Sequence, residues 1–266
     1  MTQPLLAIVN ADDFGLSREE NRVIVAAFDA GVVSSATLMA NMPAFTEACA
    51  LGHEHGVQDS LGLHFNLTYG EPLSPALRRE PAFCDADGRL DLGLPRHVLR
   101  LSASAAAALR GELQAQWQAC LAQGIRPSHI DSHQHVHNLW PIAALVARFA
   151  AEQGVPVRLA RNLGRNIGPA KRLFKYLLNR RLSRLSGCSV AQVCTPRDLL
   201  DGLRPGSPVE IVAHPSRLAD GGFGDAYLPP GESLVEVLAS GLGQHRRISY
   251  RDLAALSAAG LGSPCG

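Results

Sequence analysis

Short apolar runs alternate with longer segments of helical period along most of the chain, and this alternation constrains the fold more than any other feature. The predicted strands are residues 5–10, 32–40, 61–68, 128–136, 155–160 and 209–213, and the predicted helices include residues 43–54, 102–123, 141–153 and 250–259. A capping box at Ser17 and Glu20 begins a further helix, which Gly31 ends. Such alternation predicts a mostly parallel sheet with crossover helices. We therefore expect an α/β fold, a closed or distorted (β/α) barrel, in one domain covering residues 1–266.

One segment departs from this pattern. Residues 69–98 are rich in Pro, Gly and Asp and show little periodicity. In a compact domain, a loop of this length is more often a functional insertion than a simple connection. We predict that it is an insertion loop.

Two adjacent carboxylates, Asp12 and Asp13, follow the first predicted strand. On an extended backbone, neighbouring side chains point in different directions. One carboxylate can then bind a metal while the other accepts a proton. The sequence Asp-Asp-Phe-Gly also suits a simple turn before a helix, so this motif alone leaves both interpretations open.

Histidines mark two further strands. His64 lies in an otherwise apolar strand, where a hydrogen-bonded core histidine is the more common explanation. A later strand reads His-Ile-Asp-Ser-His-Gln-His-Val-His, and on an extended chain His133, His135 and His137 would share one face. Asp131 would lie behind them at the same period. Because each imidazole carries a donor and an acceptor that need partners, this density predicts a divalent metal site rather than a surface histidine cluster.

Two other strand ends deliver polar side chains. The strand at 209–213 ends on His214, which the following proline restricts to extended conformations, and this histidine is a candidate acid or base. The strand at 155–160 carries Arg158. This arginine could orient a catalytic carboxylate by a bidentate contact, or it could equally lie on the surface.

Composition and charge exclude several classes of protein. Apolar residues make up 46% and charged residues 18%, which is ordinary for a globular protein. A net charge of +1 argues against nucleic-acid binding, and no run approaches the ~18 apolar residues of a membrane span. The six cysteines are scattered, as is typical of reduced thiols, and residues 1–10 lack the features of a signal peptide. We therefore expect a cytoplasmic protein.

One local excess of positive charge lies within residues 153–197, which contain no acidic residue. Apolar residues recur there at helical spacing and predict a basic amphipathic helix near residues 169–186. A barrel helix with a solvated face is the favoured interpretation. The alternative is peripheral contact with an anionic membrane surface.

Taken in order, these motifs resemble the YdjC-like carbohydrate deacetylases, the ChbG/HpnK family. The resemblance runs from Ile8 to about Pro215. It rests on Asn-Ala-Asp-Asp-Phe-Gly-Leu-Ser, Ser-x-Thr-Leu-Met-x-Asn, Gly-Leu-His-Phe-Asn-Leu-Thr and the histidine-rich strand. It implies a distorted barrel related to NodB-type deacetylases and an enzyme that hydrolyses the linear amide of an N-acetylated amino sugar. Ser216 departs from the glycine that often follows His-Pro in the family.

The resemblance also implies roles for the candidate residues. The implied ligands of a divalent cation, zinc or magnesium, are Asp13, His64 and His133. The implied catalytic groups are Asp12 as base, His214 as general acid and Arg158 as the residue that steadies the base. His135 and His137 match the family's histidine-rich tail, and no role is assigned to them. A bound cation would lower the pKa of a water molecule and polarise the carbonyl.

The expected substrate is an N-acetylated oligosaccharide or glycolipid, and the resemblance leaves the particular sugar open. A lipid-linked amino sugar becomes attractive if the basic helix contacts a membrane, as in the hopanoid-associated branch of the family. The alternatives are a metal-dependent hydrolase of a phosphoester or cyclic amide, and a non-catalytic sugar-binding protein. Retention of both Asp12 and Asp13 argues against the last, since binding needs no base. A homodimer is left open.

Overall fold

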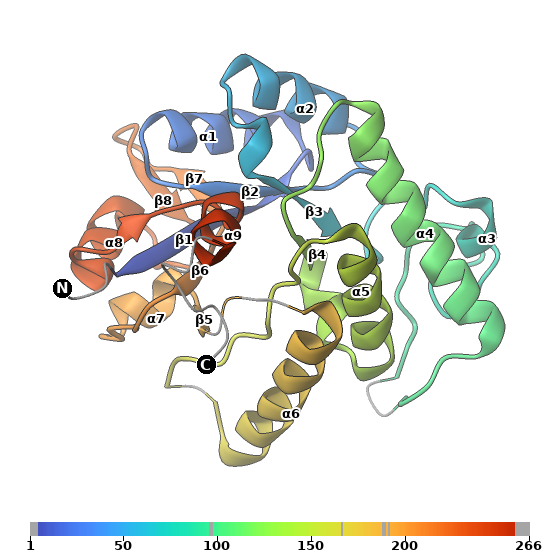
Figure 1. Ribbon diagram of the computed structural model, residues 1–266. Helices are drawn as coiled ribbons and strands as arrows, with labels where there is room; N and C mark the ends of the chain where they lie inside the picture. Colours follow the sequence, from blue (N-terminus) through green and yellow to red (C-terminus); the bar gives the residue numbers. More distant parts are fainter. Residues whose placement is uncertain (1–4, 96–97, 166, 188–189, 191, 259–266) are drawn as a thin grey trace.

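The computed structural model describes residues 5–95, 98–165, 167–187, 190 and 192–258 (Figure 1). Within these residues, the centre is a seven-stranded sheet in the order β4-β3-β2-β1-β6-β5, with β9 beside β1, and its neighbouring strands are parallel. The strands of this sheet are β1 (Leu6–Phe14), β2 (Ser35–Leu38), β3 (Leu61–Phe65), β4 (Ile130–Ser132), β5 (Gln192–Cys194), β6 (Val209–Ala213) and β9 (Arg246–Arg247). The predicted mostly parallel sheet is confirmed.

Helices connect the strands and pack around the sheet (Figure 1). They are α1 (Arg18–Asp29), α2 (Phe45–Glu54), α3 (Pro75–Arg78), α4 (Ala103–Ala122), α5 (Trp140–Gln153), α6 (Pro169–Ser186), α7 (Pro196–Leu200), α8 (Leu234–Leu242) and α9 (Tyr250–Ala258), with 3-10 helices η1 (Gln58–Ser60) and η2 (His133–Asn138). Strands β7 (Pro215–Arg217) and β8 (Phe223–Asp225) form an antiparallel pair. As predicted, Ser17 caps α1 by accepting from the Glu19 and Glu20 amides. The bounds of α6 also match the prediction, whereas residue 259 of the predicted last helix lies outside the described residues.

An irregular segment, residues 156–163, joins the two edges of the sheet, and we call it the seam. At one side it exchanges two backbone hydrogen bonds of 2.9 and 3.0 Å with Ile130 of β4. At the other side the Asn162 amide donates to the Val193 carbonyl of β5 at 3.2 Å. The sheet therefore curls into a distorted barrel, which confirms the predicted fold class. The prediction of a regular strand here is wrong, because only Val157 forms a β-bridge.

The predicted histidine-rich strand ends early, at Ser132. Gln134 and His135 then adopt left-handed backbone conformations, with φ of 48° and 55°, inside η2. The Ser132 hydroxyl accepts a hydrogen bond from the His137 amide at 3.0 Å, so a local turn replaces the sheet ladder. The prediction that His133, His135 and His137 share one face of an extended strand is therefore wrong.

The predicted insertion loop runs from the end of β3 to α4 and contains the short helix α3. Its first part is tied to α4 by the buried Glu112 carboxylate, which accepts from the Leu73 and Ser74 amides at 3.0 and 2.7 Å. In the part of the chain that the structure describes, no helix is both long enough and apolar enough to cross a membrane.

Candidate functional site

A β-bulge at the end of β1 separates the two adjacent carboxylates. The register between β1 and β2 shifts between Ala11 and Phe14, and Asp13 adopts φ of 70°. Such a bulge re-aims the side chains that it carries. Asp12 is consequently buried against groups inside the barrel, whereas the half-buried Asp13 contacts His64 and His133.

Two imidazoles converge on one oxygen of Asp13. His64 Nε2 lies 3.2 Å and His133 Nδ1 lies 2.8 Å from Asp13 Oδ1. One ligand atom from each of the three residues lies within 4.8 Å of the other two. Two imidazoles and one carboxylate are a common ligand set for a catalytic divalent cation that keeps open positions. The structure thus brings together the three residues that the family resemblance implies as ligands, and their role as ligands stays a prediction.

The ring of His64 is oriented by a neighbouring strand. Asp131 of β4 stands opposite His64 in the parallel register, and its Oδ1 lies 2.7 Å from His64 Nδ1. This contact turns Nε2 toward Asp13, where that nitrogen is buried and has no hydrogen-bond partner among the described residues. A carboxylate behind a histidine that points an unpaired nitrogen into a cluster is the usual support of a metal-ligating imidazole. These residues therefore fit a metal ion.

The charges around the cluster favour a cation. Burial lowers the pKa of His64, but the carboxylates of Asp131 and Asp12 outweigh burial and raise this pKa to about 10. Burial would raise the pKa of Asp13, but the hydrogen bond from His133 and the close approach of the charged His64 ring hold it far below its ordinary value. In the protein without a bound ion, the protonated His64 ring carries a positive charge that the surrounding carboxylates stabilise. The same carboxylates would stabilise a cation at this place.

The fully buried Arg158 guanidinium connects three carboxylates. It donates to both oxygens of Asp12 at 2.7 and 2.8 Å, and it pairs with Asp131 at 2.6 Å and with Glu210 at 2.7 Å. The sequence left open whether Arg158 orients a carboxylate or lies on the surface, and the structure places it in the interior, against the Asp12 carboxylate. Burial by itself would raise the pKa of Asp12, and the Arg158 charge outweighs it, so this pKa lies below its ordinary value. Asp12 is ionised at neutral pH and held in one orientation.

His214 follows β6 and lies beside both carboxylates. Its Nε2 is 3.9 Å from an oxygen of Asp12 and 3.9 Å from an oxygen of Asp13. Its backbone amide donates to Asp225 at 2.6 Å, and its ring meets the edge of the Tyr227 ring at a centroid distance of 4.7 Å. The side chain remains 19% exposed, so it can reach a bound molecule.

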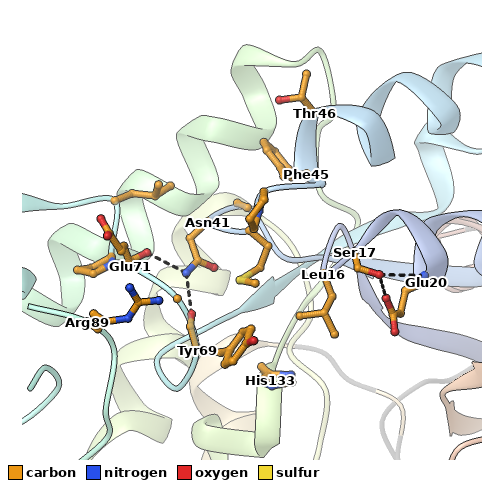
Figure 2. A pocket seen from close by; sticks show the side chains of 16 residues that line it. Leu16, Ser17, Glu20, Asn41, Phe45, Thr46, Tyr69, Glu71, Arg89 and His133 are labelled. Carbon is orange, nitrogen blue, oxygen red and sulfur yellow. Dashed lines mark hydrogen bonds between the residues drawn. The ribbon is translucent and has the colours of Figure 1, made fainter.

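The cluster opens onto a cleft of about 1000 Å³, of which His133 forms one end (Figure 2). The loop between β2 and α2 and the insertion loop line it, the latter through Tyr69, Gly70, Glu71, Pro72, Leu73 and Arg89. Asn41 joins these two loops by donating to the backbone carbonyls of Tyr69 and Glu71 at 3.1 and 2.9 Å (Figure 2). The volume and the mixed lining suit a small organic ligand.

Several supporting residues were not predicted from the sequence. Asn10 donates to Asp12 at 3.0 Å and Thr37 donates to Asp131 at 3.0 Å, although both residues lie within the quoted motifs. Glu210 is a buried acidic residue in an apolar strand, and a buried acidic group needs a polar or cationic partner. His135 is exposed, and His137 is buried beside Ser132, so neither joins the cluster of possible ligands.

Comparison with known proteins identifies relatives. A "Chitooligosaccharide deacetylase" of Klebsiella pneumoniae (strain 342) is 32% identical over 243 residues, covering 88% of this chain and 90% of that protein. A "Carbohydrate deacetylase" of Geobacillus stearothermophilus is 39% identical over 158 residues, 59% of this chain and 61% of that protein, so the match spans about three fifths of this relative.

The fold also matches a solved structure from Enterococcus faecalis V583, described as a cellobiose-phosphate cleavage protein. The TM-score is 0.67 at 20% sequence identity, and the match covers 94% of this chain and 99% of the other. A family model for "YdjC-like protein" matches residues 6–247, which include every candidate site residue. The chain belongs to the YdjC-like protein family.

Proposed function

We propose that this protein is a metal-dependent hydrolase that removes the acetyl group from an N-acetylated amino sugar. The observation that carries the proposal is the convergence of His64, His133 and Asp13 beside a separate, ionised Asp12. Amide hydrolysis needs an activated water and a proton acceptor, and this arrangement offers a place for each. The names of the similar curated proteins supply the class of substrate.

Asp13, His64 and His133 would hold the divalent cation. Their ligand types suit zinc, and magnesium is the second candidate. When bound, the cation would lower the pKa of a water molecule and polarise the acetamide carbonyl.

Asp12 accepts the proton of the attacking water, because it is ionised and adjacent to the cluster without being one of its ligands. Arg158 and Asn10 are positioning residues, since both donate to its carboxylate. His214, which lies beside both carboxylates, protonates the departing amine. Each proton transfer of this kind contributes typically ~100- to 10,000-fold.

The cleft beside His133 would hold the sugar. The insertion loop supplies the exposed Tyr69 ring, whose flat face suits the apolar side of a sugar ring, and the charged groups of Glu71 and Arg89. An N-acetylated oligosaccharide or glycolipid fits these features. The insertion loop then sets which sugar is accepted.

Release of acetate tests the proposal. The purified protein, loaded with zinc or magnesium, is incubated with a panel of N-acetylated amino sugars, a phosphoester and a cyclic amide. We expect acetate from the sugars alone. If no sugar releases acetate and the phosphoester or the cyclic amide is hydrolysed, the protein acts on another bond and the proposal is wrong.

The Asp12→Asn variant tests the role of the base. It should retain bound metal, measured by elemental analysis, and lose nearly all activity, because the amide keeps the shape of the carboxylate and cannot accept the proton. Asp59→Asn is the matched control, since Asp59 is an exposed carboxylate paired with Arg251 at the surface. Acetate release by Asp12→Asn at the wild-type rate would show that the base is another group.

A further inference from the structure

The outward side of α6 carries apolar side chains where a solvated face is expected. Leu173 and Leu177 lie one turn apart and are 60% and 46% exposed, and Tyr176 beside them is 56% exposed. Leu178 and Leu182, on the opposite side of the helix, are fully buried. The helix thus has one apolar stripe against the barrel and a second apolar row facing solvent. A simple barrel helix with a polar outer face does not explain the second row.

Exposed cations surround this outward row. They are Arg172, Arg180 and Arg184. In the described part of the chain, none of the three forms an ion pair with a carboxylate. Arg180 and Arg184 continue the face of Leu173 and Leu177 at helical spacing, and the Arg180 guanidinium lies over the Tyr176 ring at 5.6 Å. The face is therefore apolar in its first half and positively charged in its second.

A groove of about 430 Å³ lies beside the second half of α6. Its lining residues are Trp140, Arg148, Leu177, Arg180, Arg181, Arg184 and Leu185. Four guanidinium groups and three apolar side chains thus meet without a carboxylate among them. Arg181 is held in place, since it donates to the Trp140 carbonyl at 2.9 Å and lies over the Trp140 ring at 4.4 Å. Guanidinium groups beside an apolar floor suit a phosphate that is joined to a hydrocarbon chain.

We propose that this face of α6 docks on the surface of a bilayer that contains anionic phospholipid. Leu173, Tyr176 and Leu177 insert among the headgroups, and the arginines of the groove bind lipid phosphates. The charge of the face is complementary to such a surface, and apolar residues flanked by long cationic side chains are the usual composition of an interfacial helix. The helix lies at the edge of the molecule, packed on α5, so its outward row is free to approach a plane (Figure 1). The proposal does not depend on the proposed activity.

Vesicle co-sedimentation tests this docking with the full chain. One set of vesicles contains phosphatidylcholine alone, and the other contains equal parts of phosphatidylcholine and phosphatidylglycerol. We expect the protein to sediment with the second set and not with the first, and to be released by high salt. Because each cation near an anionic surface contributes about five-fold, Arg180→Gln with Arg184→Gln should weaken binding about thirty-fold. Leu173→Glu with Leu177→Glu should abolish it.

Matched variants on other faces separate docking from loss of folding. Arg22→Gln with Arg246→Gln removes two exposed cations from α1 and β9, and Val235→Glu places a charge at an exposed apolar position of α8. These controls should bind as the wild type does, and all variants should keep the wild-type circular dichroism and unfolding midpoint. Equal sedimentation with both vesicle types, or undiminished binding by either α6 double variant, overturns the proposal. If the wild type forms a dimer that Leu173→Glu dissociates, and if it does not bind vesicles, the face belongs to an interface with a second copy of the chain. That result also overturns the proposal.

Discussion

Replacement of Arg158 by methionine should destabilise the protein far more than the loss of one ion pair on the surface. Methionine is similar in length and removes the charge. The Asp12, Asp131 and Glu210 carboxylates, all 2% exposed or less, would then remain buried together without a cation. Removing one partner of a single buried pair costs ~3–5 kcal/mol, and here three buried carboxyl groups lose the same partner. We expect a loss of about 5 kcal/mol or more at neutral pH, a large part of the ~5–15 kcal/mol that stabilises an ordinary domain.

The loss should shrink as the pH falls. In the wild type the pKa of Asp12 and that of Asp131 lie below their ordinary values, because the Arg158 charge outweighs burial. Their contribution to stability is thus present above about pH 4 and is lost as the pH falls through their folded pKa values. In the Arg158→Met variant, no guanidinium opposes the effect of burial, and burial raises the pKa values of Asp12 and Asp131. The loss of stability that comes from ionising these buried groups therefore appears only as the pH rises above about 4. The free energies of unfolding of the two proteins should therefore converge in acid.

Urea unfolding of the metal-free proteins, followed by circular dichroism at neutral pH and near pH 4, measures both effects. Arg161→Met is the matched control from the same segment. Arg161 is 27% exposed, and the 4% exposed Asp198 also accepts from the Thr195 amide and hydroxyl, so loss of the arginine should cost only about 1 kcal/mol. A cost at Arg158 no larger than at Arg161, or one that does not change with pH, would refute the assigned network.

Three further perturbations follow from the site and the core. Asp131→Asn releases the His64 ring and should weaken zinc binding about 10- to 100-fold in a competition titration; an unchanged affinity would contradict the orienting role. Because protons compete with metal for His64, whose pKa is about 10, zinc affinity should rise with pH across the neutral range, and a flat profile would exclude His64 as a ligand. Gly62→Ala should lower stability by about 1–3 kcal/mol in urea unfolding, because its Cβ would lie 2.4 Å from the His129 ring; an unchanged midpoint would show that this ring can move aside.

Much of the fold could be predicted because the strands are short and mostly apolar. The strand at 209–213 and the helix at 169–186 have the predicted bounds, since periodicity decides such segments. The turn at Gln134 and His135 could not be predicted, because positive φ at residues other than glycine has no clear sequence signal. The seam was likewise predicted as a strand, since Val-Pro-Val-Arg-Leu is apolar enough for one, but its hydrogen bonds go to two different strands.

The candidate site was predictable in part. The resemblance indicated Asp13, His64 and His133 together, and the parallel order of β1, β3 and β4 explains why residues so distant in sequence meet at one end of the sheet. Glu210 was overlooked, although a lone charge in an apolar strand demands a partner. That partner is Arg158, and the curl of the sheet brings β6 and the seam near enough for the two side chains to pair.

The seam links the stability of the barrel to the geometry of the proposed active site. Its side-chain anchor is Arg158, which also fixes the orientation of the proposed base, Asp12. In many enzymes the catalytic groups are a source of strain, and variants that relieve it gain stability at the expense of turnover. Here one guanidinium would serve both purposes, so a change that loosens the closure would also misalign the proposed proton acceptor. If the proposed role of Asp12 holds, selection for a robust scaffold and selection for rapid catalysis act in the same direction at this position.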